Sequence, residues 1–391
     1  MNKLYYPSNL DLAAFDLFRV EYRYKLLFFI STIHFARVTN KGLYKSDNDY
    51  VRVNSNIIGR FIRKNDVKRV KDDLFKMGII ETDNVRIYKK KSFGFRFTEQ
   101  YRGQKVTTMK NPYPKQASSP ELTKQTHAYL FKNLQTVTIE PAAYDFINDS
   151  YREDVKKYNC NLISSDFIAE KEWFFSTDKN TGRVFNNITN LGRDLRKFLR
   201  LDGQPVFEVD VANCQPLLLH SVYENKETAE AKRYLRLVES GKFYELLQTL
   251  TGEEDRSKIK KQFLTFLFSK ERDLAKWALS IENEFAQQFP ELTAIISAMR
   301  KRDKDALWKK LQTLEASIII GKVVPKCEAL GLKVLTIHDS LLTHEEDKKT
   351  VKSLIKKEFA AELGVKVSVK TKDDKSCVNV ISEEEESHRA A

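Results

Sequence analysis

Two aspartates stand next to short apolar runs in widely separated parts of this chain of 391 residues. Asp210 ends one such run and is followed by helix-like sequence. Asp339 lies in a tight turn between two strand-like runs, residues 334–337 and 341–343, which is the pattern of a β-hairpin with polar residues at its tip. Two carboxylates on neighbouring strands would form an oxygen-rich site for hard divalent cations, of which Mg²⁺ is the natural occupant.

A cationic helix is predicted between the two aspartates, at residues 256–269. Arg256, Lys260 and Phe268 are four and eight residues apart in sequence, so they share one helical face. A stripe of two cations and a ring suits a triphosphate with a stacked base. Lys258 and Lys261 are expected to point elsewhere on this helix.

The order of carboxylate strand, cationic-aromatic helix and His-Asp hairpin resembles motifs A, B and C of the family A DNA polymerases and of the related phage-type single-subunit RNA polymerases. The resemblance covers roughly the last half of the chain and lies in order and spacing. It implies an α+β fold with a compact right-hand polymerase core at residues 116–390. That core would contain a palm with motif A near residues 207–219, reduced fingers near 225–305 and the motif C hairpin near 333–343.

The resemblance also implies a catalytic role for several residues. Asp210, Asp339 and the backbone carbonyl of Val211 would hold two Mg²⁺ ions, with Mn²⁺ as an alternative. Two such ions activate an attacking 3′-hydroxyl and neutralise the charge of the leaving pyrophosphate. Lys260 would neutralise the triphosphate and protonate the pyrophosphate, while Arg256 would help to hold the γ-phosphate.

Two positions bear on the choice of sugar. Phe268 stands where these families mostly have Tyr, whose hydroxyl helps the RNA enzymes to sense the 2′-hydroxyl. Gln215 lies five residues after Asp210, where the DNA enzymes have a Glu that crowds the 2′ position. Both differences favour dNTPs, whereas Ser340 matches the RNA enzymes. The resemblance therefore implies DNA synthesis, with a DNA-directed RNA polymerase or primase that uses NTPs as the alternative.

Further residues are expected to touch primer and template. Residues 181–191 are similar to the T-G-R stretch that precedes motif A, which implies nucleic-acid contacts for Arg183, Asn187 and Asn190. His338 resembles the motif C histidine that contacts the primer terminus. A structural hydrogen bond from this histidine to its neighbours is compatible with that role.

Residues 1–115 resemble a winged-helix DNA-binding domain. A short helix is expected at residues 55–62, and a second one begins near Asn65 and ends at Gly78. Two strand patterns then flank a basic turn at residues 89–91, and the second helix would enter the major groove of DNA. The expected phosphate contacts of this helix are Lys64, Lys68 and Arg69. A basic module that packs against the rest of the chain or binds a protein is the alternative.

Composition sets the broad class. Hydrophobic residues make up 41% of the chain, which is typical of a globular protein. The net charge of +13 favours a polyanionic partner. Residues 107–125 contain three prolines, which predicts a linker with a domain boundary near residue 115. The four cysteines form no C-x-x-C pair, which favours a reducing compartment, and no apolar run reaches the length of a membrane span.

The resemblance and the composition together predict a magnesium-dependent nucleotidyltransferase that synthesises DNA on a nucleic-acid template. Its partners would be template, primer and nucleoside triphosphates, with no membrane. The small size and the resemblance imply replication, priming or repair for a phage, plasmid or other mobile element, in the cytoplasm of a bacterial or phage-infected cell. A non-catalytic, DNA-binding replication initiator is the alternative from another class. The oligomeric state is left open.

Overall fold

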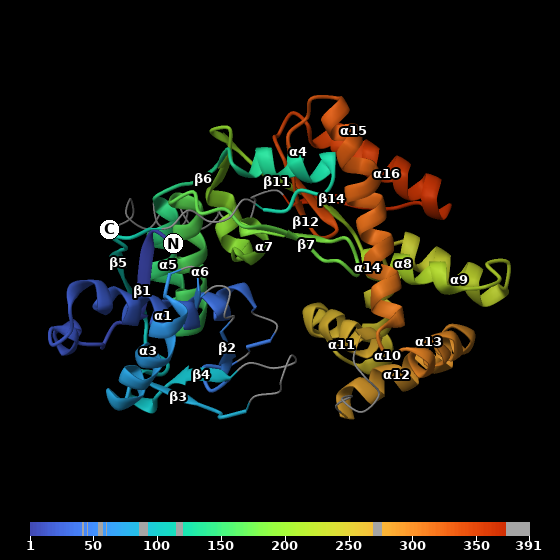
Figure 1. Cartoon of the computed structure of the whole chain (residues 1–391). Coiled ribbons are helices and arrows are strands. Elements are labelled where there is room, and N and C mark those ends of the chain that lie inside the picture. Colours follow the sequence, from blue (N-terminus) through green and yellow to red (C-terminus); the bar gives the residue numbers. More distant parts are fainter. Residues whose placement is uncertain are drawn as a thin grey trace, which may run out of the picture. The chain divides into compact units, whose positions relative to one another are not determined.

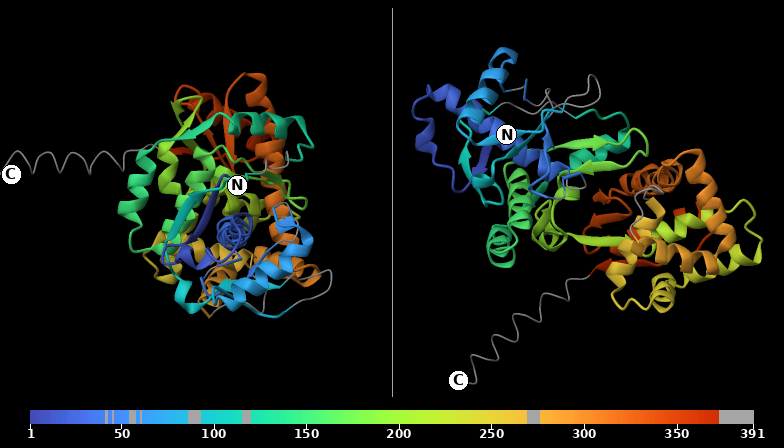
Figure 2. Two further views of the ribbon diagram at one scale, coloured as in Figure 1. Left: turned by 60° about the vertical axis from the view of Figure 1, so that its left-hand side comes forward. Right: turned by 90° about the horizontal axis from the view of Figure 1, so that it is seen from below.

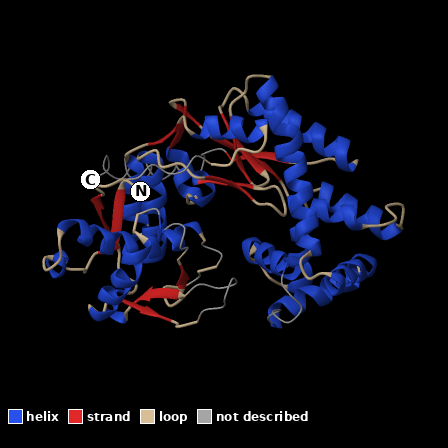
Figure 3. Ribbon diagram, in the orientation of Figure 1, coloured by secondary structure: helices blue, strands red, loops and turns tan. Residues whose placement is uncertain are grey.

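The computed structural model describes residues 1–40, 43–44, 46–53, 58–59, 61–85, 93–114, 120–268 and 276–372 (Figure 1). Within these residues, α-helices are combined with several small sheets, as Figure 3 shows, so the α+β class is confirmed. The chain divides into two units. Unit 1 consists of Met1–Pro120, Val137–Phe174 and Asn186–Gly203, and unit 2 consists of Glu121–Thr136, Phe175–Phe185 and Gln204–Ala391.

The chain passes between the units several times, in contrast to the single expected boundary near residue 115. Part of the expected linker is a strand. Strand β5 (Val106–Lys110) pairs antiparallel with β1 (Lys3–Pro7), and the buried side chains of Leu4 and Val106 anchor the pair in the core of unit 1. The prolines therefore follow a strand that the apolar core holds, and residues 115–119 lie outside the described part.

Helix α1 (Val20–Thr39) is the central helix of unit 1. Its residues 26–34 are all buried. It packs against β1, against α3 (Lys64–Lys76) and against α6 (Val155–Ala169). Among the described helices, none is both long enough and apolar enough to pass through a bilayer.

The helix and strands expected after residue 63 are present in unit 1. Helix α3 buries Val70 and Leu74, and Gly78 follows it with the left-handed φ of +65° that glycine adopts without strain. Strands β2 (Val51–Arg52), β4 (Gly94–Phe97) and β3 (Ile80–Thr82) form a sheet in that order. The basic turn at residues 89–91, and half of the first expected helix, lie outside the described residues. The winged-helix assignment therefore remains a proposal.

The remaining elements of unit 1 are short. Strand β6 (Val137–Ile139) pairs antiparallel with β9 (Leu199–Leu201). The helices are α5 (Ala142–Ser150) and α7 (Asn187–Asn190), together with the 3₁₀ turns Leu12–Phe15, Glu99–Tyr101 and Arg193–Phe198.

Unit 2 is built on a four-stranded sheet with the order β12 (Val334–Ile337), β13 (Ser340–Thr343), β11 (Phe207–Val211) and β14 (Val369–Lys372). Strand β11 runs antiparallel to both of its neighbours. Helix α16 (Lys348–Leu363) packs on β11, β13 and β14. Helix α4 (Gln125–Leu134) lies against β12, where the Asn133 side chain donates a hydrogen bond of 3.0 Å to the Val334 carbonyl.

Helices fill the segment between β11 and β12, as Figure 2 also shows. They are α8 (Cys214–Leu219), α9 (Ala229–Glu239), α10 (Phe243–Thr251), α11 (Arg256–Phe268), α12 (Lys276–Gln288), α13 (Pro290–Arg302), α14 (Ala306–Ile318) and α15 (Val324–Ala329), with a π-helical turn at Ile319–Val323. A buried aromatic cluster formed by Tyr234, Phe243, Phe263 and Phe285 joins α9 to α12. The remaining strands are β7 (Phe175–Thr177) and β8 (Val184–Asn186), which form a two-stranded sheet, and the two-residue strand β10 (Gln204–Pro205).

Candidate active site

The two aspartates come from adjacent parts of one sheet. Strand β11 pairs antiparallel with β13, and in this register Asp210 lies opposite Ser340. Asp339 immediately precedes Ser340, in the two-residue turn that joins β12 to β13. Neighbouring strands are about 4.8 Å apart. The register therefore brings both carboxylates to the tip of the hairpin, and the predicted hairpin itself is confirmed.

His338 forms the other half of this turn. Its φ of +55° is in the left-handed region, which costs a residue with a side chain about 1–2 kcal/mol. Two-residue hairpin turns favour positive φ because their twist then matches that of the strands. The His338 ring packs edge-on against Phe185, with centroids 5.6 Å apart. The turn thus fixes His338 directly beside Asp339.

The carboxyl group of Asp339 has a pKa raised to about 7. Burial is the main cause, because it disfavours the charged form, and the carboxylates of Glu315 and Asp210 add repulsion. The Lys260 ammonium group opposes this shift, which shows that α11 directs positive charge towards the hairpin tip. Acidic groups that repel one another in this way suit a site that takes a cation.

The set of possible ligands fits one class of metal better than another. In the described part of the chain, no group of three or more His, Cys, Asp and Glu side chains could hold a metal ion. A structural zinc site needs such a group, usually four ligands. Mg²⁺ is typically held by one or two carboxylates together with waters and substrate phosphates. Asp210 and Asp339 remain the proposed magnesium ligands, with the carbonyl of the buried Val211 as a proposed further ligand.

A buried acid that the sequence did not single out lies in the same unit. Glu315, on α14, is 1% exposed, and its Oε2 accepts hydrogen bonds from Arg183 Nη2 at 2.6 Å and from Gln215 Nε2 at 2.5 Å. Burial raises the pKa of Glu315, whereas the contacts with Arg183 and Gln215 lower it. The structure therefore joins two predicted site residues, Arg183 and Gln215, through one buried acid.

The bonding of this cluster is incomplete among the described residues. Glu315 Oε1, Gln215 Oε1 and Arg183 Nε are all buried without a hydrogen-bond partner. Such groups are costly to leave unpaired. One sequence signal could have revealed Glu315: it is a single carboxylate between apolar residues of a helix, and a buried acid normally has a partner.

Cys214 is also surrounded by these charges. Burial raises the pKa of its thiol well above the usual value, and the carboxylates of Asp339 and Glu315 raise it further. A thiol with a raised pKa stays protonated at neutral pH and is a poor nucleophile. Cys214 therefore contributes to packing rather than to chemistry.

The cations of α11 divide into two groups. Lys260, Lys261 and Phe268 line one surface groove of about 520 Å³. The expectation that Lys261 points away from Lys260 is therefore wrong, because adjacent residues on a helix are only about 100° apart and a wide groove includes both. Lys258 instead pairs with Glu253.

Arg256 is directed to a different set of neighbours. Its guanidinium group is 3.4 Å from Glu245 Oε1 and 3.4 Å from Asn213 Oδ1, and it lies 5.2 Å from the centroid of the Tyr244 ring. Asn213 has a left-handed backbone and begins α8 directly after β11. Arg256 is thus tied to the turn that follows Asp210, while Lys260 and Phe268 face the groove.

The asparagines expected to contact nucleic acid belong to unit 1, whereas Arg183 belongs to unit 2. Asn187 is 2% exposed. Its Oδ1 accepts from the backbone N–H of Phe174 at 2.9 Å, and its Nδ2 donates to the Glu172 carbonyl at 2.9 Å. These bonds commit the Asn187 side chain to the fold. Asn190, at the end of α7, is partly exposed.

The three basic residues proposed to contact DNA from unit 1 are all exposed on α3. They are Lys64, Lys68 and Arg69. The Arg69 guanidinium group lies 3.7 Å from Asp73 Oδ2 and 4.6 Å from the centroid of the Tyr22 ring. Their exposure is what phosphate contacts require.

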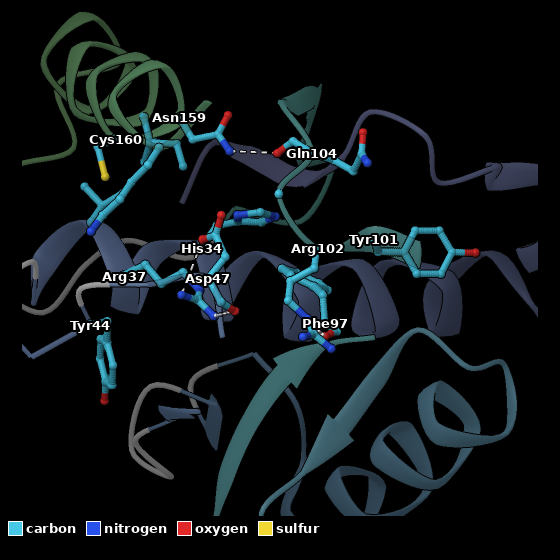
Figure 4. Close-up of a pocket in the computed structure, with 14 residues that line it drawn as sticks. His34, Arg37, Tyr44, Asp47, Phe97, Tyr101, Arg102, Gln104, Asn159 and Cys160 are labelled. Atoms are coloured by element: carbon cyan, nitrogen blue, oxygen red, sulfur yellow. Dashed lines mark hydrogen bonds and ion pairs between the residues drawn. The ribbon is translucent and has the colours of Figure 1, made fainter. Parts of the chain in front are cut away.

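A pocket beside α1, shown in Figure 4, is too small for a substrate. Its volume is about 30 Å³, close to the space of one water molecule. Its polar groups largely serve the fold: Arg37 donates to the carbonyls of Ser46, Asp47 and Asp49. Burial and the nearby Arg37 lower the pKa of His34 to about 3, so this ring is neutral.

Comparisons with known proteins give little further information. No protein-family model matches the chain, and no curated protein matches it. Among solved structures, it is similar to the POL domain of Pol1 from M. smegmatis in complex with DNA primer-template and dNTP. The identity is 12% and the TM-score 0.42, over 65% of this chain and 60% of that one. Similarity at this level establishes neither fold nor function, so the proposals below rest on the residues of the site.

Proposed function

We propose that this protein is a nucleotidyltransferase that synthesises DNA from dNTPs on a nucleic-acid template by two-metal catalysis. The observation that supports this most directly is that Asp210 on β11 and Asp339 in the β12–β13 turn lie close together, with the Lys260 ammonium group near enough to offset part of the rise in the pKa of Asp339. A divalent-cation site beside a cation that can hold phosphate is the arrangement that phosphoryl transfer needs.

In the proposed reaction, the 3′-hydroxyl of a primer attacks the α-phosphorus of a dNTP. The P–O bond to pyrophosphate breaks, and the hydroxyl proton passes to solvent water. Asp210, Asp339 and the Val211 carbonyl would hold two Mg²⁺ ions, which increase the nucleophilicity of the hydroxyl and neutralise the pyrophosphate. Lys260 binds the triphosphate and donates a proton to the leaving pyrophosphate.

The groove on α11 provides the proposed nucleotide site. Its volume of about 520 Å³ and its lining by Lys260, Lys261 and Phe268 suit a triphosphate next to a base. Lys261 adds a second cation to this groove, although the sequence pattern predicted that it points elsewhere on the helix. Arg256 holds the γ-phosphate only if it leaves the Glu245 and Asn213 contacts described above.

Gln215 is the proposed sugar filter. Its side-chain nitrogen is bonded to Glu315, so its orientation is fixed before any substrate arrives. A fixed amide of this size would crowd a 2′-hydroxyl, which favours dNTPs over NTPs. His338 and Arg183 are the proposed primer and template contacts of unit 2, and the exposed face of α3 is the proposed DNA contact of unit 1. The setting remains replication, priming or repair in a mobile element.

The direct test is incorporation of labelled dNTPs and, separately, NTPs on primed and unprimed DNA with Mg²⁺. We expect extension by dNTPs, which Asp339→Ala abolishes. The control is Asp303→Ala, because Asp303 is an exposed acid just after α13 whose carboxylate contacts Lys309 and the backbone N–H of Asp305. Incorporation of NTPs instead would make the protein an RNA polymerase or primase. No incorporation under any condition would favour the non-catalytic initiator.

A further inference from the structure

Unit 1 contains an aromatic groove outside the proposed polymerase site. It is formed by the first half of α1, by the residues that precede α3 and by the segment after β5. Its volume is about 460 Å³, within the range of roughly 300–1,000 Å³ that is typical of ligand pockets. The aromatic residues that line it are Tyr24, Phe28, Phe61 and Tyr113.

The rings are arranged in two pairs. Phe61 lies over the buried Phe28, with centroids 4.0 Å apart and planes inclined by 30°, and remains partly exposed itself. Tyr113 meets Tyr24 edge-on, with centroids 5.4 Å apart. Tyr113 is 50% exposed. A single exposed ring needs no explanation, but Tyr24, Phe61 and Tyr113 all keep exposed ring surface around one groove, where flat groups can stack.

Tyr113 is held in place by the fold. Its backbone N–H donates to Asn111 Oδ1 at 3.1 Å, and Asn111 Nδ2 donates to the carbonyl of Met1 at 2.8 Å. Asn111 is 4% exposed. The backbone that carries the exposed Tyr113 ring is therefore held by the buried Asn111, so little conformational freedom would be lost when a ligand binds.

The charged residues are distributed unevenly along the groove. Arg63, which is exposed, lies at the end of the groove next to α3, and Lys64 and Lys68 continue the exposed basic face along that helix. Lys25 also lines the groove, but its amine is bonded to Asp66 at 2.7 Å. Glu21 is the acid of the lining. Positive charge is thus concentrated at the α3 end, where a phosphate would bind.

We propose that this groove binds an unpaired base of a nucleic-acid single strand, with the adjoining phosphate at Arg63. Stacking on aromatic rings and a nearby cationic path are the two elements by which proteins bind single strands without reading sequence. Such a site differs from the insertion of α3 into a duplex groove. It also does not depend on the proposed catalysis, because it uses no metal and no residue of unit 2.

The test is fluorescence anisotropy of the full chain with labelled single-stranded DNA and RNA of the same sequence, without Mg²⁺ or nucleotides. Tyr113→Ala should weaken binding about 5- to 150-fold, the loss expected for one stacked base. Tyr113→Phe should restore it, because the ring is retained. The matched control is Tyr158→Ala, which removes a partly exposed tyrosine of α6 in the same unit, outside this groove.

The salt dependence of binding distinguishes the proposed phosphate contact at Arg63 from the proposed stacking on Tyr113. Arg63→Gln should reduce the slope of log affinity against log salt by about one, whereas Tyr113→Ala should lower affinity and leave the slope unchanged.

Dependence on Tyr113 with DNA only, or with RNA only, would identify which strand is bound. Equal affinities of the wild type and Tyr113→Ala for both strands would overturn the proposal, as would a Tyr113 effect that appears with a peptide but not with nucleic acid.

Cross-linking locates the site independently of affinity. An oligonucleotide that carries iodouracil should, on irradiation, attach to a peptide that contains Phe61 or Tyr113. Attachment to peptides of unit 2 alone would contradict the proposal while leaving the polymerase proposal intact. Conversely, failure of all nucleotide incorporation would not affect this proposal, because neither the anisotropy measurement nor the cross-linking involves turnover.

Discussion

Unit 2 holds its acidic groups and its cations in different ways. The strand register places Asp210 and Asp339, and Glu315 is buried on a neighbouring helix with two donors on one oxygen. Lys260 is exposed on α11. The tertiary structure therefore fixes the positions of the acidic groups, although their charges repel one another. The position of Lys260 depends only on the periodicity of α11, and its exposed side chain can change conformation.

This difference has an energetic consequence. Loss of one member of a buried ion pair leaves an uncompensated charge and costs about 3–5 kcal/mol. Loss of an exposed pair typically costs about 0–1 kcal/mol. Loss of Glu315 should therefore affect folding, because it breaks a buried ion pair, while substitutions on α11 should affect chemistry alone.

The largest effect is expected at the metal-binding carboxylates. Asp210→Ala and Asp339→Ala should each reduce nucleotide incorporation to background, because neither carboxylate can replace the other as a ligand. Affinity for primed DNA, measured by anisotropy, should stay near that of the wild type. Full activity in either variant would remove these residues from the site.

Glu315→Ala should lower the free energy of unfolding by about 3–5 kcal/mol, because the Arg183 side chain, only 15% exposed, would lose its charge partner. Urea denaturation measures this. The control is Glu362→Ala, which breaks the more exposed pair with Lys322 and should cost about 0–1 kcal/mol. Similar losses in both variants would show that burial does not distinguish the two kinds of charge.

Lys260→Ala should lower kcat/KM for dNTP incorporation about 100-fold, since one preorganised donor to the developing charge is lost. Stability should hardly change, because Lys260 is exposed. Lys258→Ala on the same helix should have wild-type kinetics, since Lys258 is paired with Glu253. If the two variants behaved alike, α11 would serve only as a general basic surface.

The smallest effect concerns a buried group of unit 1. Burial and the nearby Arg37 lower the pKa of His34 from its ordinary value of about 6.5 to about 3 in the folded state. The unfolded chain therefore binds a proton here that the folded chain does not, so stability is present above pH 6.5 and is lost as pH falls towards 3. From pH 6.5 to 5.5 the loss should be on the order of 1 kcal/mol. His34→Gln should flatten this dependence in urea denaturation, and an unchanged slope would contradict burial of a neutral ring.

Local patterns predicted those features that depend on neighbours in sequence. The alternation around residue 339 predicted a hairpin, which β12 and β13 form. The pattern between Asn65 and Gly78 predicted a helix, which α3 forms. Spacing also placed Lys260 and Phe268 on one face of α11, but it could not show that Arg256 turns to Glu245 and Asn213, because those partners come from other elements.

The division of the chain could not be predicted from composition. Prolines mark the segment after residue 110, yet the strand before them pairs with β1, roughly a hundred residues earlier in the chain. Residues 137–174 and 186–203 join unit 1 across this apparent boundary. Pairing between distant strands is set by the fit of their buried faces, and a local composition shift does not report it.

The sequence by itself determined the two carboxylates, the cationic helix between them and the basic character of α3, because residue type and helical or strand period suffice for these. Only the tertiary structure decided that Glu315 joins Arg183 to Gln215, that Asn187 serves the fold and that four rings from three segments meet in one groove. These outcomes depend on which distant surfaces pack together. Packing is a property of the whole chain, since each contact must be compatible with all the others.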